Sequence, residues 1–427
     1  MALPRPPWAS RVPLPVVVVF AARLFDSPKA GAEDRVEYRF EDYNEDNHRM
    51  HIQTHAAGFE AEFFSRITAK GLFVYDSISG ATPTGEQAPA GSQELPLAQI
   101  EDVRRAVSLE AAIRYDRHTT TPQYSYSEEG DYLSHGVALN HTLDFNQKNT
   151  TLVLGASHNF DSVGGGALAE WQRKDSTDVM VGVNQLLGPR TVLTVNLTLG
   201  YADGYLADPY RRVSFLLPES PDPIFSDAGQ VNPVGEKRPE HRFRQVGYAS
   251  VMQAFESVGA SLEAGYRLHH DDWGTWSHTV SLTWAQKIGS RVILAPTFRY
   301  YYQTAADFYA PSFQGVSFSQ YAGGTRLAFE QGTFVGFEGD PSFPVPADES
   351  KFQILDVPGR PDYYSADYRL SEFQAFTYGV NARVKLCERF SVDMAYKRYE
   401  MQGLDGITPA ESYPSANVFT LGFGIPF

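Results

Sequence analysis

The stretch TVLTVNLTLGY, residues 191–201, alternates between large apolar residues and small or polar ones. Its apolar face carries Leu193, Val195, Leu197, Leu199 and Tyr201. A repeat of two residues is the period of a β-strand, in which successive side chains point to opposite faces. The stretch therefore predicts a strand with one apolar face and one face of small polar side chains.

A second stretch of this kind, WSHTVSLTWA at residues 276–285, carries an aromatic residue at both ends of its apolar face. Trp276 and Trp284 are eight residues apart, which is about 26 Å along an extended strand. Strands of transmembrane barrels have aromatic residues at both membrane interfaces. In a soluble sandwich, polar residues are the more common strand ends. The spacing therefore favours a strand that crosses a membrane.

About sixteen such segments follow one another along the chain. They lie near residues 35–43, 50–62, 67–79, 102–115, 117–129, 131–146, 149–161, 174–187, 190–203, 242–256, 259–272, 274–287, 291–304, 366–386, 389–402 and 415–427. Links of a few residues alternate with mostly longer ones, which include 80–101, 204–241 and 305–365. Outer-membrane barrels have an even strand number, short periplasmic turns and longer external loops. The pattern predicts an all-β fold, a transmembrane up-and-down antiparallel barrel of about sixteen strands over residues 33–427.

The start of the chain resembles an export signal. Arg5 and Arg11 precede the apolar run 12–22, and small residues at positions 30–32 supply a cleavage motif. Residues 1–32 are therefore predicted to be a signal peptide, with a buried N-terminal strand as the alternative. Together with the barrel pattern, this predicts a protein of the bacterial outer membrane, in contact with its lipid.

The last eleven residues, NVFTLGFGIPF, also alternate. Phe423, Ile425 and Phe427 share one face, and Phe427 ends the chain. Pro426 removes one hydrogen-bond donor, but next to the terminus that loss is smallest. The ending looks like the C-terminal strand that outer-membrane barrels present to the barrel assembly machinery, which is therefore an expected partner.

The composition excludes several classes of protein. The net charge of the 427 residues is −15, which argues against a nucleic-acid partner. The single Cys387 excludes an internal disulfide and a thiolate metal cluster. The longest apolar run, residues 16–22, is far shorter than the ~18 residues that a membrane-spanning helix needs.

Several longer stretches are similar to an uncharacterised bacterial outer-membrane family, domain of unknown function 3570. They are QTHAAGFEAEF (53–63), FVYDSISGATPTG (73–85), LDFNQKNTTL (143–152), GVNQLLGPRTVLT (182–194), EKRPEHR (236–242), QKIGSRVILAPTFRYYYQTAADFY (286–309), YYSADYRLS (363–371) and YKRYEMQGLDGIT (396–408). The resemblance spans nearly the whole chain after the predicted signal peptide, and residues 310–360 match least well. It implies a barrel, without a catalytic residue, ligand or transported solute.

Charged residues on the predicted inward faces are candidates for lining a pore. They are Glu110, Arg114, Glu263, Arg267, Arg299, Gln303, Arg383 and Lys385. Acids and bases across a lumen can set a transverse field that orients permeating solutes. Alternatively, the interior is polar as in any barrel of this kind, and its charges simply pair.

The predicted loop 305–365 is long enough to fold into the lumen or to project outward. It is acidic, with residues such as Asp307, Glu330 and Asp356 outnumbering its bases. If it lines the channel, we expect a preference for cations, whereas an outward loop is surface decoration.

Histidines near strand ends suggest a weaker alternative, a metal site. His48, His51 and His55 cluster near one predicted loop, and His269 and Asp271 near another. Imidazole and carboxylate groups can bind divalent cations, but no spacing matches a zinc motif, which favours ordinary polar loop residues.

The sequence contains no group of residues that matches a catalytic site. His141 and His158 are predicted to face lipid, with His141 opposite Leu154 and His158 opposite Val137, too far apart for a catalytic pair. We therefore expect no enzymatic activity and no cofactor.

A lumen of sixteen strands is wide enough for an aqueous passage. The sequence therefore predicts a porin-like channel for small polar solutes or ions. One alternative is a plugged barrel that acts as an export or assembly partner of periplasmic proteins. A second is a barrel with a metal-binding or enzymatic loop site. A TonB-driven receptor is disfavoured because the chain lacks room for a plug domain and 22 strands.

Overall fold

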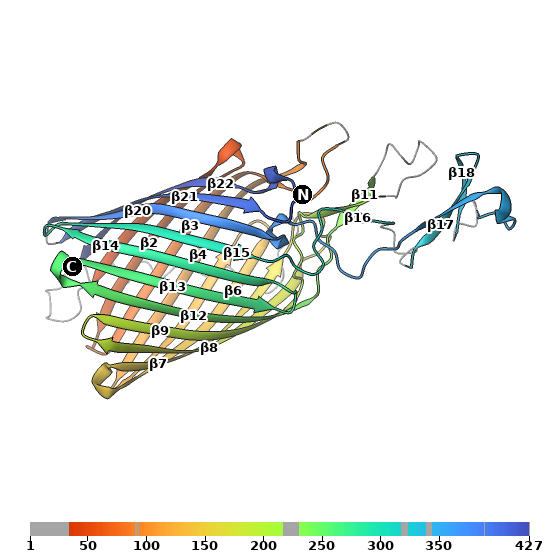
Figure 1. The fold of residues 1–427 in the computed structure, drawn as a ribbon. Helices are drawn as coiled ribbons and strands as arrows, with labels where there is room; N and C mark the ends of the chain where they lie inside the picture. The colour runs from red at the N-terminus through yellow and green to blue at the C-terminus, as the bar shows by residue number, and fades with distance from the viewer. Residues whose placement is uncertain are drawn as a thin grey trace.

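Sixteen antiparallel strands close into a barrel in the computed structural model, which describes residues 34–89, 92, 94–216, 230–316, 323–338, 344–387 and 389–426. Neighbours in the barrel follow one another along the chain, and β1 (Arg35–Glu45) pairs with β22 (Ser415–Pro426) to close the ring (Figure 1). The predicted all-β, up-and-down antiparallel barrel is thus confirmed. The predicted signal peptide, residues 1–32, and the terminal Phe427 lie outside the described residues.

Each of the sixteen predicted segments overlaps one barrel strand. Besides β1 and β22, the barrel strands are β2 (Met50–Phe63), β3 (Ile67–Pro83), β4 (Leu97–Tyr115), β5 (His118–Glu128), β6 (Tyr132–Phe145), β7 (Thr150–Val163), β8 (Gln172–Gly188), β9 (Thr191–Gly204), β12 (His241–Phe255), β13 (Ala260–Asp271), β14 (Trp276–Ile288), β15 (Val292–Gln303), β20 (Phe373–Cys387) and β21 (Phe390–Gly403). Among the described residues, the helical segments are the 3-10 turns η1 (Asp46–His48), η2 (Asn146–Lys148), η3 (Glu256–Val258), η5 (Glu349–Lys351), η6 (Tyr368–Leu370) and η7 (Ala410–Ser412). Within the described residues, no helix is long and apolar enough to span a membrane.

The apolar face of each strand forms the outside of the barrel. On β9, Val195 and Leu197 are 47% and 48% exposed, and the small polar residues between them turn inward because side chains alternate along a strand. Exposed apolar residues recur around the ring, among them Val137 on β6, Leu282 on β14 and Phe419 on β22. Such a continuous apolar surface is typical of a barrel that faces lipid.

The first and last strands close the barrel in a continuous register. Arg35 pairs with Pro426 and Tyr38 with Phe423, and the rings of Tyr38 and Phe423 lie 5.1 Å apart. Phe423 and Ile425 both lie exposed on the outer face. Because Pro426 is the last paired residue of the strand, its missing N–H leaves the rest of the ladder intact.

The two ends of the barrel differ in their connections. At the turn end, where β1 begins and β22 finishes, the links are short: 64–66, 116–117, 146–149, 189–190, 256–259, 289–291 and 388–389. At the opposite loop end, three links are short, 46–49, 129–131 and 272–275, whereas the links 205–240 and 304–372 are long. The sorting of long links to one end agrees with the sequence pattern.

The two long links contain small sheets that the sequence pattern did not predict. One consists of β10 (Arg212–Leu216), β11 (Gln230–Gly235) and β16 (Phe313–Gln314), and the other of β17 (Thr325–Glu330), β18 (Thr333–Phe337) and β19 (Gln353–Val357). Figure 1 shows β17 and β18 well beyond the loop end. Both ends of link 304–372 stay near the barrel, where the N–H of Ala306 donates to the carbonyl of Leu370 at 2.8 Å. The described β17–β19 sheet therefore projects outward, and the base of the link lies over the mouth.

Candidate functional site

The eight charged or polar residues predicted to line a pore all lie on the lumenal face. On β4, exposed Ile113 and Tyr115 mark the outer face, so Glu110 and Arg114 point inward by alternation. The same argument places the other six, which are Glu263 and Arg267 on β13, Arg299 and Gln303 on β15, and Arg383 and Lys385 on β20. Apart from half-buried Glu110 and buried Gln303, these side chains are exposed. The lumen is therefore open to water where they lie.

Some of these lumenal charges pair, and others have no partner. Glu110 accepts a hydrogen bond from Gln123 Nε2 at 2.5 Å and lies 3.6 Å from Lys70 Nζ. Arg383 donates to Asp393 at 2.6 Å. By contrast, no hydrogen bond or ion pair joins the side chains of Glu263 and Arg267 to another residue in the described part of the chain. The expectation that all lumenal charges pair is thus met only in part.

Gln303 differs from the other seven predicted pore-lining residues because its side chain is bonded to a loop. Its Nε2 donates to the carbonyls of Arg369 and Ser371 at 3.0 and 2.9 Å, and its Oε1 accepts from Tyr301. Gln303 therefore fixes the end of link 304–372 to the barrel wall, instead of presenting a free amide to the pore.

The lumenal charges are segregated by wall. On β1–β4, the acidic wall, the charged residues are Glu37, Glu41, Glu45, Glu60, Glu62, Asp76, Asp102 and Glu110 against Arg35, Arg39, Lys70, Arg104 and Arg114. On β12–β20, the basic wall, they are Arg242, Arg244, Arg267, Lys287, Arg299, Arg383 and Lys385 against Glu263 and Asp271. In the closed strand order, β12, β13 and β14 stand across the ring from β2, β3 and β4. An excess of each sign on facing walls sets a field across the lumen.

At the loop end, the lumen opens into a chamber of about 840 Å³, here called the mouth chamber. Its wall includes Glu129 and Asp131 from the link between β5 and β6, and Arg242 and Arg244 from β12. Residues 205–210 of one long link and Asp367, Arg369 and Leu370 of the other complete it. The chamber therefore joins barrel wall and loops at the entrance to the lumen.

A buried ion-pair cluster around Asp367 holds the two long links together. Asp367 is 1% exposed and accepts hydrogen bonds from Arg238 Nη2 at 2.7 Å and from Arg369 Nη2 at 2.6 Å. Arg211 Nε lies 3.8 Å from the same carboxylate. Burial raises the pKa of Asp367, but Arg369, Arg211 and Arg238 outweigh it and hold that pKa well below the usual range. Asp367 is therefore ionised under all ordinary conditions.

One side of the mouth chamber is acidic. One oxygen from each of Asp102, Glu129 and Asp131 lies within 4.8 Å of the others. The N–H of Gly130 donates to both oxygens of Asp102 at 3.0 Å, and the hydroxyl of Tyr210 donates to Asp131. Burial, followed by the charges of Asp102 and Asp131, raises the pKa of Glu129. The negative charge on this side is therefore poorly compensated.

The other side of the chamber is lined by arginines that keep free donors. Arg242 donates from Nε to Asp271 at 2.8 Å and stacks over the Trp273 ring, 4.4 Å from its centroid. Arg244 donates from Nη2 to Asp178 at 3.1 Å. A guanidinium group has five N–H donors, and within the described residues Nη1 of Arg242 and Nη1 of Arg244 have no hydrogen-bond partner. This side can thus still bind an oxygen acceptor.

The predicted metal groups do not assemble. Alternation along β2 sends His51 and His55 to the outer face, where His51 Nε2 lies 2.7 Å from Asp42 and His55 Nδ1 lies 2.7 Å from the Tyr38 hydroxyl. His48 belongs to the turn η1. His269 lies inside the lumen, 3.8 Å from Asp271, which is fully buried and held by Arg242. Among the described residues, the group with metal-like spacing is instead Asp102, Glu129 and Asp131.

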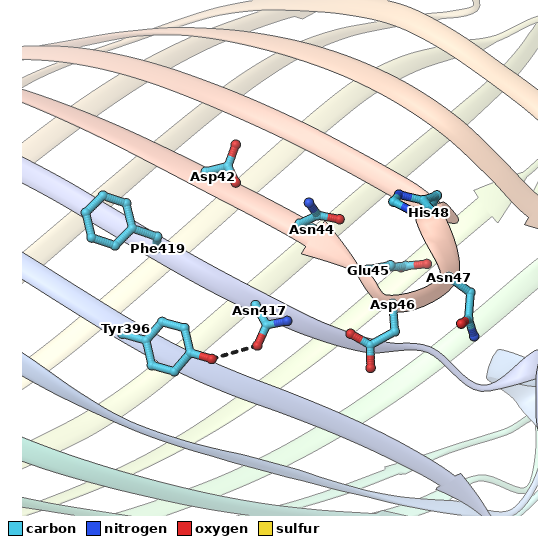
Figure 2. Close-up of a pocket in the computed structure, with 9 residues that line it drawn as sticks. All are labelled: Asp42, Asn44, Glu45, Asp46, Asn47, His48, Tyr396, Asn417 and Phe419. Carbon is cyan, nitrogen blue, oxygen red and sulfur yellow. Dashed lines mark hydrogen bonds between the residues drawn. The ribbon is translucent and has the colours of Figure 1, made fainter.

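A hollow of about 300 Å³ lies beside η1, at the rim of the loop end, and Figure 2 shows the residues that line it. In it, the hydroxyl of Tyr396 donates to Asn417 Oδ1 at 2.7 Å. Its acidic residues are already engaged, Asp42 by His51 and Asp46 by Arg398. This rim hollow therefore offers less uncompensated charge than the mouth chamber.

His141 and His158 lie as predicted. His141 pairs with Leu154 and His158 with Val137 in the register of β6 and β7, and both point outward beside exposed Leu139 and Phe160. His141 Nδ1 lies 2.9 Å from the Thr120 hydroxyl and His158 Nδ1 lies 2.8 Å from that of Thr177. On the other ring nitrogen, His141 Nε2 lies 3.1 Å from His118 Nδ1, and His158 Nε2 lies 3.9 Å from Asp175, which is beyond hydrogen-bond distance.

The sequence interpretation missed the residues of the mouth chamber and of the Asp367 cluster. A signal was nevertheless present in two of the stretches that carry the family resemblance. EKRPEHR contains Glu236, Arg238 and Arg242, and YYSADYRLS contains Asp367 and Arg369. The fold brings these two stretches together, as the bond between Arg238 and Asp367 demonstrates.

A closed ring of sixteen strands, apolar outside and charged inside, defines the class of outer-membrane-type β-barrels. Residues 14–421 match the family model described as "Protein of unknown function (DUF3570)", and the chain belongs to this family. No curated protein matches the chain.

Similar barrels occur among solved structures, and the three named here share 10% identity or less with this chain. The siderophore receptor PirA from Pseudomonas aeruginosa has 10% identity and a TM-score of 0.40, with 93% of this chain and 64% of that chain covered. This chain thus spans less than two thirds of PirA. A bacterial polysaccharide outer membrane secretin has 7% identity and a TM-score of 0.45, with 93% and 100% covered. The CymD monoaromatic hydrocarbon channel has 9% identity and a TM-score of 0.38, with 93% and 89% covered.

Proposed function

We propose that this chain resides in the bacterial outer membrane and forms a passive channel for small polar solutes or ions. The observation that carries the proposal is the lumen itself, in which charged side chains such as Arg267, Glu263 and Arg299 are exposed. Charged groups exposed inside a barrel line a space that water can occupy. The proposal assigns the chain no catalytic step.

The outer surface supports a membrane location. Trp276 and Leu282 lie exposed on the same face of β14, and transfer of such side chains from water to lipid is favourable by about 25 cal/mol per Å². On this proposal, lipid is the first partner of the chain, and the C-terminal strand is the segment through which the barrel assembly machinery inserts it.

The acidic wall and the basic wall suggest how a channel would select among solutes. A solute with a dipole gains energy when it aligns with a transverse field, and an apolar solute gains nothing. The acidic β17–β19 sheet projects away from the barrel (Figure 1), so the selectivity of the lumen depends on the walls and not on that sheet. The channel is therefore expected to favour polar over apolar solutes of the same size.

Conductance measurements test the proposal. The folded chain is reconstituted in a planar bilayer under a salt gradient, and heat-modifiable gel mobility verifies folding beforehand. We expect steady single-channel steps and a reversal potential that reports the balance of the two walls. A folded and inserted barrel that conducts no ions would overturn the proposal in favour of the plugged export or assembly partner.

A further inference from the structure

We propose that the mouth chamber binds small zwitterions, solutes that carry both an ammonium and a carboxylate group, such as free amino acids and short peptides. This inference names the solute class of the proposed channel and in that sense rests on the proposed function. It is carried by two sets of groups of opposite charge that line one chamber: the carboxylates near Glu129, and the guanidinium groups of Arg242 and Arg244.

The acidic side matches an ammonium group. Asp102, Glu129 and Asp131 place three carboxylate oxygens within 4.8 Å of one another. Within the described residues, no basic side chain forms an ion pair with any of the three, because nearby Arg104 is bound to Asp76 at 2.5 Å. An ammonium group carries three donors and one positive charge. It would therefore relieve the repulsion among these carboxylates and bond to more than one of them.

The basic side matches a carboxylate group. Arg242 and Arg244 line the chamber, and their Nη1 groups have no described partner. Arg369 lines it as well, with its Nε and Nη2 already bonded to Asp367 and Asp208. Hydrogen bonds between guanidinium and carboxylate groups are charge-assisted and about twice as strong as neutral ones. A solute carboxylate would thus find donors in the same chamber as the site of its ammonium group.

Pairing within the wall disfavours a ligand of a single charge. Asp271 and Asp178 already compensate Arg242 and Arg244, and Asp161 lies 3.6 Å from Lys174. An anion alone therefore meets donors without a net positive field, and it also meets the uncompensated Glu129 side. A cation alone leaves the arginine donors unused. A zwitterion uses both sides.

The chamber is large enough to admit this class of solute. Its volume of about 840 Å³ lies within the range of roughly 300–1,000 Å³ that is common for small-molecule pockets. The chamber lies at the loop end, between the long links and the charged lumen. A solute held there would be concentrated at the entrance to the channel.

Isothermal titration calorimetry of the full chain in detergent tests the inference with three probes. Glycylglycine carries both charges, N-acetylglycine lacks the ammonium group, and ethylamine lacks the carboxylate. We expect glycylglycine to bind about tenfold or more tightly than either analogue, because each analogue lacks one of the two charged groups that the chamber would bind. Equal binding of glycylglycine and N-acetylglycine, or no saturable binding of any probe, would overturn the inference. Saturable binding of calcium alone, without glycylglycine, would also overturn it.

Two variants locate the site. Glu129→Gln removes the acidic partner and is expected to weaken glycylglycine about tenfold, whereas the matched change Glu411→Gln, at an exposed residue of η7 outside the chamber, leaves it unchanged. Arg244→Gln is expected to weaken glycylglycine and to leave ethylamine unaffected. If both chamber variants bind glycylglycine as the unaltered chain does, the chamber is not the site.

Calorimetry does not depend on ion flow, so the inference and the proposed channel can fail separately. Binding by a barrel that conducts no ions would preserve the chamber site and refute the channel. A conducting barrel that binds no zwitterion would preserve the channel and refute the site.

Discussion

Arg238 and Asp367 are 129 residues apart in the chain, and Nη2 of Arg238 donates to Oδ2 of Asp367 at 2.7 Å. The bond links the end of one long connection to the end of the other. Glu236, which lies 2.8 Å from Arg238 Nε and accepts from the Ser365 hydroxyl, makes a second link between the same segments. The loops over the mouth are thus held together by buried polar groups as well as by an apolar cluster that contains Phe215 and Tyr364.

Asp367→Asn is expected to release the long links. The change leaves Arg211, Arg238 and Arg369 without their shared carboxylate, and loss of one partner from a buried ion pair costs about 3–5 kcal/mol. Limited trypsin digestion followed by mass spectrometry should show faster cleavage within 205–216 and 358–372. The control is Asp356→Asn, whose side chain on β19 is 86% exposed. Equal cleavage of the two variants would contradict the role of Asp367 in holding the two long links together.

Acidification is expected to neutralise Glu129 in the mouth chamber before it disrupts the ion-pair cluster around Asp367. The pKa of Glu129 is raised, so its charge disappears as pH falls through a value above the usual range near 4.3. The pKa of Asp367 is lowered, so the stability it contributes is present above about 3.9 and is lost only as pH falls through its much lower folded value. The contribution of Glu129 to stability depends on pH in the opposite direction. Its protonated form stabilises the folded chain, and this stability is lost as pH rises through the raised pKa.

Binding and proteolysis measured between pH 7 and pH 4 separate these two effects. The affinity for glycylglycine should fall as the pH falls across this interval. Segments 205–216 and 358–372 should stay protected from cleavage, which is measured with an acid-tolerant protease at the lower pH. Release of the loops together with the loss of affinity would show that one titration controls both.

Single lumenal charges are expected to set ion selectivity. Glu110→Gln removes a charge from the acidic wall and should shift the reversal potential toward anions, whereas Arg267→Gln should shift it toward cations. Because water screens the lumen, each change in permeability ratio is expected to be roughly twofold. Arg105→Gln is the control, since Arg105 lies on the outer face of β4 and pairs there with Glu128. Equal shifts by Arg105→Gln would disconnect selectivity from the lumen.

Neighbouring residues of β9 test the assignment of the two faces. Leu197→Arg places a charge on the outer face, where it should destabilise the barrel in a bilayer by about 2–4 kcal/mol near the midplane. Thr198→Arg places the same charge in the lumen and should be tolerated. Urea titrations of both variants refolded in lipid vesicles measure the difference. A larger loss for Thr198→Arg would invert the assignment.

The candidate site could be predicted from the sequence only where it belongs to a strand. Glu110, Arg267 and Arg383 were placed on the lumenal face because the period of two fixes the face of every strand residue. The same period turns His51 and His55 outward on β2, where His51 contacts Asp42 and His55 contacts Tyr38. Gln303 was placed on the correct face, but its role as an anchor for Arg369 and Ser371 depends on a loop.

The sequence by itself determined the sixteen strands, their two faces and even the pairing of His141 with Leu154, because alternation and short turns are local properties that repeat along the chain. Only the tertiary structure decided the mouth chamber and the outward course of β17–β19. These features depend on contacts such as that of Asp208 with Arg369, 161 residues away. Loops have no periodic pattern, so the partners of their charges are fixed only when the closed barrel brings both long links to the same end.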